Sequence, residues 1–142
     1  MALTNIKIIP SKTTMENIST LLHKYNLPDN DFIAVPHCTI IYSPDVVPAN
    51  KIPVNISLPI IVKDSKLTLF DTKDDGIVLV IEFTNSDLSK YFRFLKDTFQ
   101  FTTKYDEYRP HITIAKNVDK KFTDLPKINF DLVFDKIEIE TE

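Results

Sequence analysis

The chain has 142 residues, 43% of them hydrophobic and 26% charged, which is the composition of one globular domain with its own core. Its one glycine excludes the glycine-rich loops of dinucleotide and P-loop sites, and its one cysteine excludes an intramolecular disulfide and a cysteine-rich zinc site. The net charge of −3 argues against a protein that binds long nucleic acid non-specifically. Because the sequence fits neither a signal peptide nor a membrane helix, we expect the protein in the cytoplasm, away from membranes.

The beginning of the chain is expected to form a strand, a helix and a second strand, in that order. The run NIKII at 5–9 has the composition of a β-strand. Apolar residues then recur at steps of three and four over 15–25, which predicts an amphipathic helix with Ser11 or Thr13 as its N-cap. The stretch PHCTIIYS at 36–43 follows as the second strand.

A proline-rich connection leads to the second part of the chain, which repeats this order with additional strands. Five runs are expected to be strands: 59–62, 66–70, 77–83, 129–134 and 136–140. The turn at 74–76 contains the only glycine, where a positive φ is favourable. A helix is expected over 88–99 with Asn85 or Ser86 as its N-cap, and the strand PHITI at 110–114 follows it.

The sequence contains an internal repeat, marked by PHCTI at 36–40 and PHITI at 110–114. Overlaid at one fixed offset without gaps, the strand and helix patterns that precede the two stretches also coincide. We therefore expect a single domain, 1–142, with two internal repeats at roughly 1–74 and 75–142. The predicted fold class is α+β: two pseudo-symmetric lobes of antiparallel sheet, each backed by a helix, around a central groove.

Each repeat places a histidine and a threonine two positions apart on a strand. Because side chains alternate between the faces of a sheet, His37 and Thr39 are expected on one face and Cys38 on the other. The same alternation turns His111 and Thr113 together, away from the core. Two lobes facing each other would then direct two imidazoles and two hydroxyls to one point.

Two imidazoles and two hydroxyls suit the cleavage of a phosphodiester. A neutral histidine can take a proton from the attacking hydroxyl, while a protonated one gives a proton to the leaving oxygen. Threonine hydroxyls can donate hydrogen bonds to the phosphate oxygens, and this chemistry requires no metal or cofactor. The ordinary alternatives are strand residues without function, or a metal site, for which two histidines without a nearby carboxylate are a poor ligand set.

The paired motifs resemble the signature of the two-histidine (2H) phosphoesterase superfamily, and the resemblance covers the whole chain. Within it the stretches HCTIIYSPDVVP, LFDTKDDGIVLVIEF and YDEYRPHITIA are most similar to the phage anti-CBASS cyclic oligonucleotide phosphodiesterases. This resemblance implies a metal-independent hydrolase of 3′–5′ linked cyclic di- and trinucleotides, the alarm signals of bacterial immunity, working in the host cell cytoplasm. It implies His37 and His111 as acid and base, and Thr39 and Thr113 as phosphate ligands.

Four further residues are candidates for substrate binding. The phage relatives carry a tryptophan that stacks on a base, whereas this chain has none, and Phe70 stands in about the right place to replace it. Tyr105 and Tyr108 precede the second motif and are candidates for base or phosphate contact. Glu138 could accept a hydrogen bond from an adenine amino group. The alternatives are a core position for Phe70, loop aromatics packing on the sheet, and a solvated strand edge at Glu138.

Two other functions stay open beside the hydrolysis of cyclic oligonucleotides. One is an RNA-end or 2′–5′ oligoadenylate phosphodiesterase, which would use the same histidines on a linear substrate. The other is a sponge that binds a cyclic nucleotide without cutting it. The two histidines are nearly interchangeable by symmetry, and our working assignment makes His37 the base and His111 the acid.

Overall fold

The computed structural model describes residues 3–24, 33–72, 76–104, 107–118 and 125–142. Its elements in chain order are β1 (Thr4–Pro10), α1 (Lys12–His23), β2 (Cys38–Ser43), the 3-10 helix η2 (Ala49–Lys51), β3 (Ile60–Val62), β4 (Ser65–Asp71), β5 (Ile77–Phe83), α2 (Ser86–Phe99), β6 (His111–Ala115) and β7 (Leu132–Thr141). The two strand–helix–strand units of the predicted repeat are β1–α1–β2 and β5–α2–β6.

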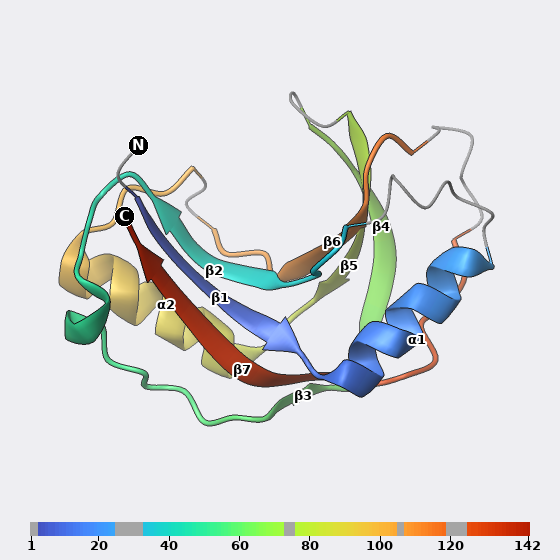
Figure 1. Ribbon diagram of the computed structural model, residues 1–142, viewed down its shortest axis with the longest axis horizontal. Coiled ribbons are helices and arrows are strands. Elements are labelled where there is room, and N and C mark those ends of the chain that lie inside the picture. Colours follow the sequence, from blue (N-terminus) through green and yellow to red (C-terminus); the bar gives the residue numbers. More distant parts are fainter. Residues whose placement is uncertain (1–2, 25–32, 73–75, 105–106, 119–124) are drawn as a thin grey trace.

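All the described strands belong to one antiparallel sheet in the order β3-β7-β1-β2-β6-β5-β4. Figure 1 shows this sheet curled into a half-barrel. The predicted α+β class is confirmed, but where two separate sheets were expected the structure has one. The two halves are joined because Cys38 of β2 pairs with Ile112 of β6, which is the one pair formed between these strands in the described ranges.

The C-terminal strand β7 is longer than the sequence indicated. Two strands were expected, at 129–134 and 136–140, whereas a single strand pairs with β1 from Thr4↔Thr141 to Pro10↔Phe134. The register shifts between Ile9 and Pro10, so that Asp135 is an extra residue in a β-bulge rather than a break between strands. The two ends of the described chain meet as a result, with backbone hydrogen bonds in both directions between Leu3 and Glu142.

Both helices begin at a capping residue that the sequence offered. The Ser11 hydroxyl accepts from the backbone N–H of Thr14, and the Asn85 side chain accepts from the backbone N–H of Leu88 at 2.9 Å. The apolar sides of the two helices are buried in one core cluster: Ile18, Leu21 and Leu22 from α1, and Leu88, Tyr91, Phe92 and Leu95 from α2. The helices therefore pack on one face of the sheet.

Two smaller features complete the fold. Gly76 has a φ of +68°, which confirms the positive φ expected there, while the preceding Asp74 and Asp75 lie outside the described residues. None of the helices in the described ranges is both long and apolar enough to pass through a bilayer.

Candidate active site

The two His-x-Thr motifs lie on the face of the sheet that points away from the core. Four apolar residues of β2 and β6 are at most 2% exposed and belong to the core cluster: Cys38, Ile40, Ile112 and Ile114. Alternation turns their neighbours to the opposite face, where four polar residues are partly exposed: His37, Thr39, His111 and Thr113. The predicted separation of polar and apolar side chains is confirmed.

The pairing of β2 with β6 sets the two motifs side by side. Cys38 lies opposite Ile112 in an antiparallel register. One residue to either side, the same register sets His37 opposite Thr113 and Thr39 opposite His111. The four polar residues are thus arranged symmetrically about the Cys38–Ile112 pair, with each histidine facing the threonine of the other motif.

The two imidazoles are held in the same way by the backbone two residues before them. Nδ1 of His37 lies 3.1 Å from the carbonyl oxygen of Val35, and Nδ1 of His111 lies 2.9 Å from that of Arg109. A carbonyl oxygen only accepts, so Nδ1 is the nitrogen that carries the proton in both rings. This leaves both Nε2 atoms to face a ligand, where such an atom can accept a proton when the ring is neutral and donate one when it is charged.

The two threonine side chains lie on the same face of the sheet as the histidines. Neither Thr39 Oγ1 nor Thr113 Oγ1 has a hydrogen-bond partner among the described residues, although the Thr39 carbonyl accepts from the hydroxyl of Tyr108 at 2.8 Å. A hydroxyl beside an imidazole, free to donate, is what a phosphate oxygen requires. Two imidazoles and two hydroxyls arranged in this way are chemically suited to a phosphate group.

Both the ring and the hydroxyl of Tyr108 contact other side chains or backbone groups of the protein. Its ring stacks on Phe92 with centroids 4.8 Å apart, and its hydroxyl also lies 3.5 Å from Sγ of Cys38. Burial raises the pKa of Tyr108 well above its ordinary value, and burial likewise raises the pKa of the Cys38 thiol to about 11. These contacts match the packing alternative for Tyr108, and Cys38 is the small buried residue expected from its position on the strand.

Phe70 lies beside the second histidine. It shares a sheet face with Val78 of β5 and stands outside the core cluster, and its ring meets the His111 ring edge-on at a centroid distance of 5.3 Å. The core alternative for Phe70 therefore does not hold. Tyr105, the remaining aromatic candidate, lies outside the described residues.

Glu138 occupies the corresponding face at the other end of the site. Lys7 of β1 pairs with Thr39 on one side and with Glu138 on the other, so all three side chains share the face of the histidines. The Lys7 ammonium lies 3.9 Å from Glu138 and 3.2 Å from Glu140, and Lys136 lies 3.5 Å from Glu138. Glu138 is thus a half-exposed, ion-paired carboxylate on the polar face.

A comparison of the sequence with family models decides the family. The model of the family described as anti-CBASS protein Acb1 matches residues 4–142, a span that contains both motifs and every described strand. The chain belongs to the Acb1 family. Membership indicates an anti-CBASS function and implies interaction with cyclic nucleotide signals.

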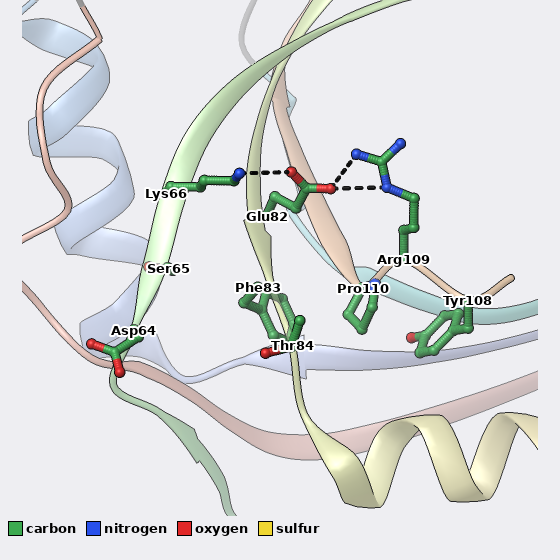
Figure 2. A pocket seen from close by; sticks show the side chains of 9 residues that line it. All are labelled: Asp64, Ser65, Lys66, Glu82, Phe83, Thr84, Tyr108, Arg109 and Pro110. Atoms are coloured by element: carbon green, nitrogen blue, oxygen red, sulfur yellow. Dashed lines mark hydrogen bonds and ion pairs between the residues drawn. The ribbon is translucent and has the colours of Figure 1, made fainter.

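This Acb1 family member also has a charged cluster beside His111. The sequence points to Arg109, next to the second motif, as positive charge near the phosphates, but sequence reasoning missed Glu82 and Lys66. Glu82 of β5 pairs with His111 across the strands, and its carboxylate accepts from Nε of Arg109 at 3.0 Å. Figure 2 shows Lys66 on the other side of the same carboxylate, at 3.8 Å. A single charged residue inside an apolar strand, as Glu82 is in IVLVIEF and Lys7 is in NIKII, was the available signal.

Within the described part of the chain, no three His, Cys, Asp or Glu side chains lie close enough together to hold a metal ion. His23, the third histidine, is exposed on α1 and its Nδ1 contacts the Ser19 carbonyl at 2.7 Å. It is therefore a surface residue at the end of α1.

Proposed function

We propose that this Acb1 family member is a metal-independent phosphodiesterase that cleaves 3′–5′ linked cyclic di- and trinucleotides in the cytoplasm of the infected cell, and so counteracts CBASS immunity. The observation that carries the proposal is the matched orientation of the two imidazoles. Both hold Nδ1–H on a backbone carbonyl and both leave Nε2 for the substrate, on either side of the Cys38–Ile112 pair.

In the proposed reaction the substrate supplies its own nucleophile. Nε2 of His37 takes the proton of a ribose 2′-hydroxyl, whose oxygen attacks the adjacent phosphorus. The bond from phosphorus to the 5′-oxygen breaks, and that oxygen leaves with the proton of Nε2 of His111. The product is a linear nucleotide with a 2′,3′-cyclic phosphate, which water then opens with the two histidines in exchanged roles.

The hydroxyls of Thr39 and Thr113 stabilise the charge that develops on the non-bridging oxygens. Each threonine lies opposite the histidine of the other motif. Each non-bridging phosphate oxygen would therefore accept from a threonine hydroxyl that stands beside an imidazole. Such a pair of half-sites is the arrangement of the two-lobed 2H phosphoesterase fold. We assign the β7–β1–β2 and β6–β5–β4 halves of the sheet to its two lobes.

The bases of the substrate would lie to either side of the scissile phosphate. Phe70, next to His111, offers an aromatic face for one base, and Glu138, next to Lys7, offers an acceptor for an exocyclic amino group. Tyr105 and Tyr108 remain candidates for contact with a base or a phosphate. For Tyr108 the available surface is its ring, because its hydroxyl is held by Thr39.

The experiment is a cleavage assay in excess EDTA. The substrates are 3′–5′ cyclic di- and trinucleotides, linear RNA and 2′–5′ oligoadenylate, and the control is the His37→Ala/His111→Ala protein. We expect the cyclic substrates to be cleaved by the wild-type protein alone, with 2′,3′-cyclic phosphate intermediates in the mass spectrum. Cleavage of only the linear substrates would leave the histidine chemistry standing and replace the cyclic substrate with an RNA end or a 2′–5′ oligoadenylate.

A sponge is the second candidate. Family membership implies interaction with cyclic nucleotides but does not by itself establish that they are cleaved. A sponge would bind a cyclic nucleotide equally well with and without the two histidines and release no product. Loss of turnover with retained binding in the double variant is the result that separates the enzyme from the sponge.

A further inference from the structure

The two motifs are matched, but their surroundings are not. The carbonyl that orients His37 belongs to Val35, whereas the one that orients His111 belongs to Arg109. Glu82 lies opposite His111 on the neighbouring strand. The register of Ile8 with Cys38 sets Ile9 in the equivalent place beside His37. Charged side chains therefore lie directly beside His111, whereas the equivalent positions beside His37 are apolar. The charged pair of that half, Lys7 and Glu138, lies beside Thr39 instead.

The Arg109 side chain is fixed before any ligand binds. Its Nε and Nη2 both donate to one carboxylate oxygen of Glu82, and its guanidinium lies 5.0 Å from the centroid of the Phe70 ring. Glu82 itself is 13% exposed and also accepts from the Thr68 hydroxyl. A side chain held by a carboxylate and a ring loses little conformational freedom when it binds a ligand.

The held guanidinium still has donors to offer. Nη1 of Arg109 has no hydrogen-bond partner in the described part of the chain, and the Arg109 side chain is 62% exposed. The Lys66 ammonium, on the other side of Glu82, is 74% exposed. Two cations share one carboxylate here, so this part of the site carries a positive charge beside His111.

A pocket of about 510 Å³ opens at this cluster. Arg109, Lys66 and Glu82 line one end of it, and Phe83, Pro110 and Tyr108 give it an apolar wall. Figure 2 shows Asp64, the other carboxylate of the lining, away from Arg109 at the opposite end. An anionic group that enters the pocket would therefore meet the cations at the end nearer His111.

We propose that Arg109, positioned by Glu82, binds the second, non-scissile phosphodiester of the cyclic substrate and so holds the substrate on the His111 side of the site. The inference rests on the proposed function, because a cyclic dinucleotide carries one phosphodiester beyond the one between the two histidines. Guanidinium N–H groups match the oxygens of a phosphodiester in geometry and charge. Lys66 adds charge without that geometry.

The test measures binding in the His37→Ala/His111→Ala background, where no ligand is cleaved. The probes are 3′–5′ cyclic diadenylate and cyclic diguanylate, with two phosphodiesters each, and the linear 3′–5′ dinucleoside monophosphates of the same bases, with one. Arg109→Ala should weaken binding of the cyclic probe about tenfold or more, and of the linear probe less than about threefold. Arg109→Lys keeps the charge and should recover part of the loss.

Arg93→Ala is the matched control, since it removes the same charge from the exposed surface of α2. It should leave both affinities unchanged. The inference would be overturned if Arg109→Ala left both affinities unchanged, as Arg93→Ala should, or lowered the affinity for both probes equally. Cleavage of the cyclic substrates by the wild-type protein would still support the proposed function in that case. If the cyclic probes bind in an Arg109-dependent way but the wild-type protein cleaves none of them, the inference about Arg109 stands and the proposed enzymatic function is overturned. A protein that neither binds nor cleaves the cyclic probes removes both.

Discussion

At the scale of single residues, the orientation of the imidazoles leaves Nε2 as the ring nitrogen that each histidine can present to a substrate. Nδ1 is committed to a carbonyl in both rings, so a proton can reach or leave the substrate only at Nε2. Because both histidines have the same contact, the structure alone does not distinguish a catalytic base from a catalytic acid. A substrate whose cleavage needs only the base can distinguish them.

A substrate with a good leaving group provides that separation. Adenosine 3′-(p-nitrophenyl phosphate) expels a phenolate that needs no proton, so the acid becomes dispensable while the base stays necessary. With His37 as the base, His37→Ala should lose about 10²-fold or more on this ester and on a cyclic dinucleotide. His111→Ala should lose as much on the cyclic substrate and recover on the ester, as measured by initial rates.

The opposite pattern would exchange the two assignments and keep the mechanism. Equal losses for both variants on both substrates would contradict acid–base catalysis by this pair. Ligand affinity, measured by titration, should stay within a few-fold of the wild-type value in both variants, because neither substitution removes a phosphate-binding hydroxyl.

Cys38 allows a prediction about stability and pH. Burial raises its pKa from 9.0 to about 11 in the folded protein. Between these values the unfolded chain releases the thiol proton while the folded chain keeps it, so the free energy of unfolding falls as the pH rises. The slope is about 1.4 kcal/mol per pH unit for one such group. Urea unfolding at pH 8 and pH 10 should show this decline, and Cys38→Ala should make it smaller, with the remainder due to the buried hydroxyls of Tyr91 and Tyr108, whose pKa values are also raised. An unchanged slope in Cys38→Ala would contradict the assignment.

At the scale of the elements, much was predictable from the sequence. Local patterns gave the strands around 5–9 and 77–83, both helices, and an N-cap pair that contained the right residue in each case, Ser11 and Asn85. The length of β7 was not predictable, because Asp135 reads as a break in the pattern while pairing with β1 carries the strand through it as a bulge. Strand pairing is a long-range property that a local pattern does not contain.

The junction between α1 and β7 includes a buried hydroxyl beside the backbone hydrogen bond from Ser11 to the Val133 carbonyl. Thr14 is 1% exposed, and its Oγ1 accepts from the backbone N–H of Val133 at 3.0 Å while it also contacts the Ser11 hydroxyl. Thr14→Val keeps the shape and leaves that N–H without an acceptor, which should lower the free energy of unfolding by about 1–3 kcal/mol. Denaturant unfolding measures the loss. Thr14→Ser, which keeps the hydroxyl, should lose clearly less; equal losses would assign the effect to packing.

At the scale of the whole molecule, the repeat predicts two related units but does not contain how they are joined. The units were expected as two sheets, and the structure joins them through the Cys38–Ile112 pair in one curled sheet. The sequence could not indicate this joint, because the residues that form it are ordinary apolar strand residues. Besides this pair and the shared core, the described residues link the two motifs through the hydrogen bond from Tyr108 to Thr39.

That hydrogen bond links the loop before β6 directly to β2, which makes Tyr108 a positioning residue for both motifs. Tyr108→Phe should lower the free energy of unfolding by about 1 kcal/mol and kcat by roughly threefold to tenfold, because the two half-sites lose a fixed spacing. Tyr91→Phe is the matched control: its hydroxyl donates to the Pro53 carbonyl at 2.8 Å, and burial raises its pKa to about 12, but it lies outside the site. The two substitutions should lower the unfolding temperature by similar amounts, whereas only Tyr108→Phe should lower kcat in the cleavage assay. A wild-type kcat for Tyr108→Phe would mean that the sheet alone holds the two histidines in place.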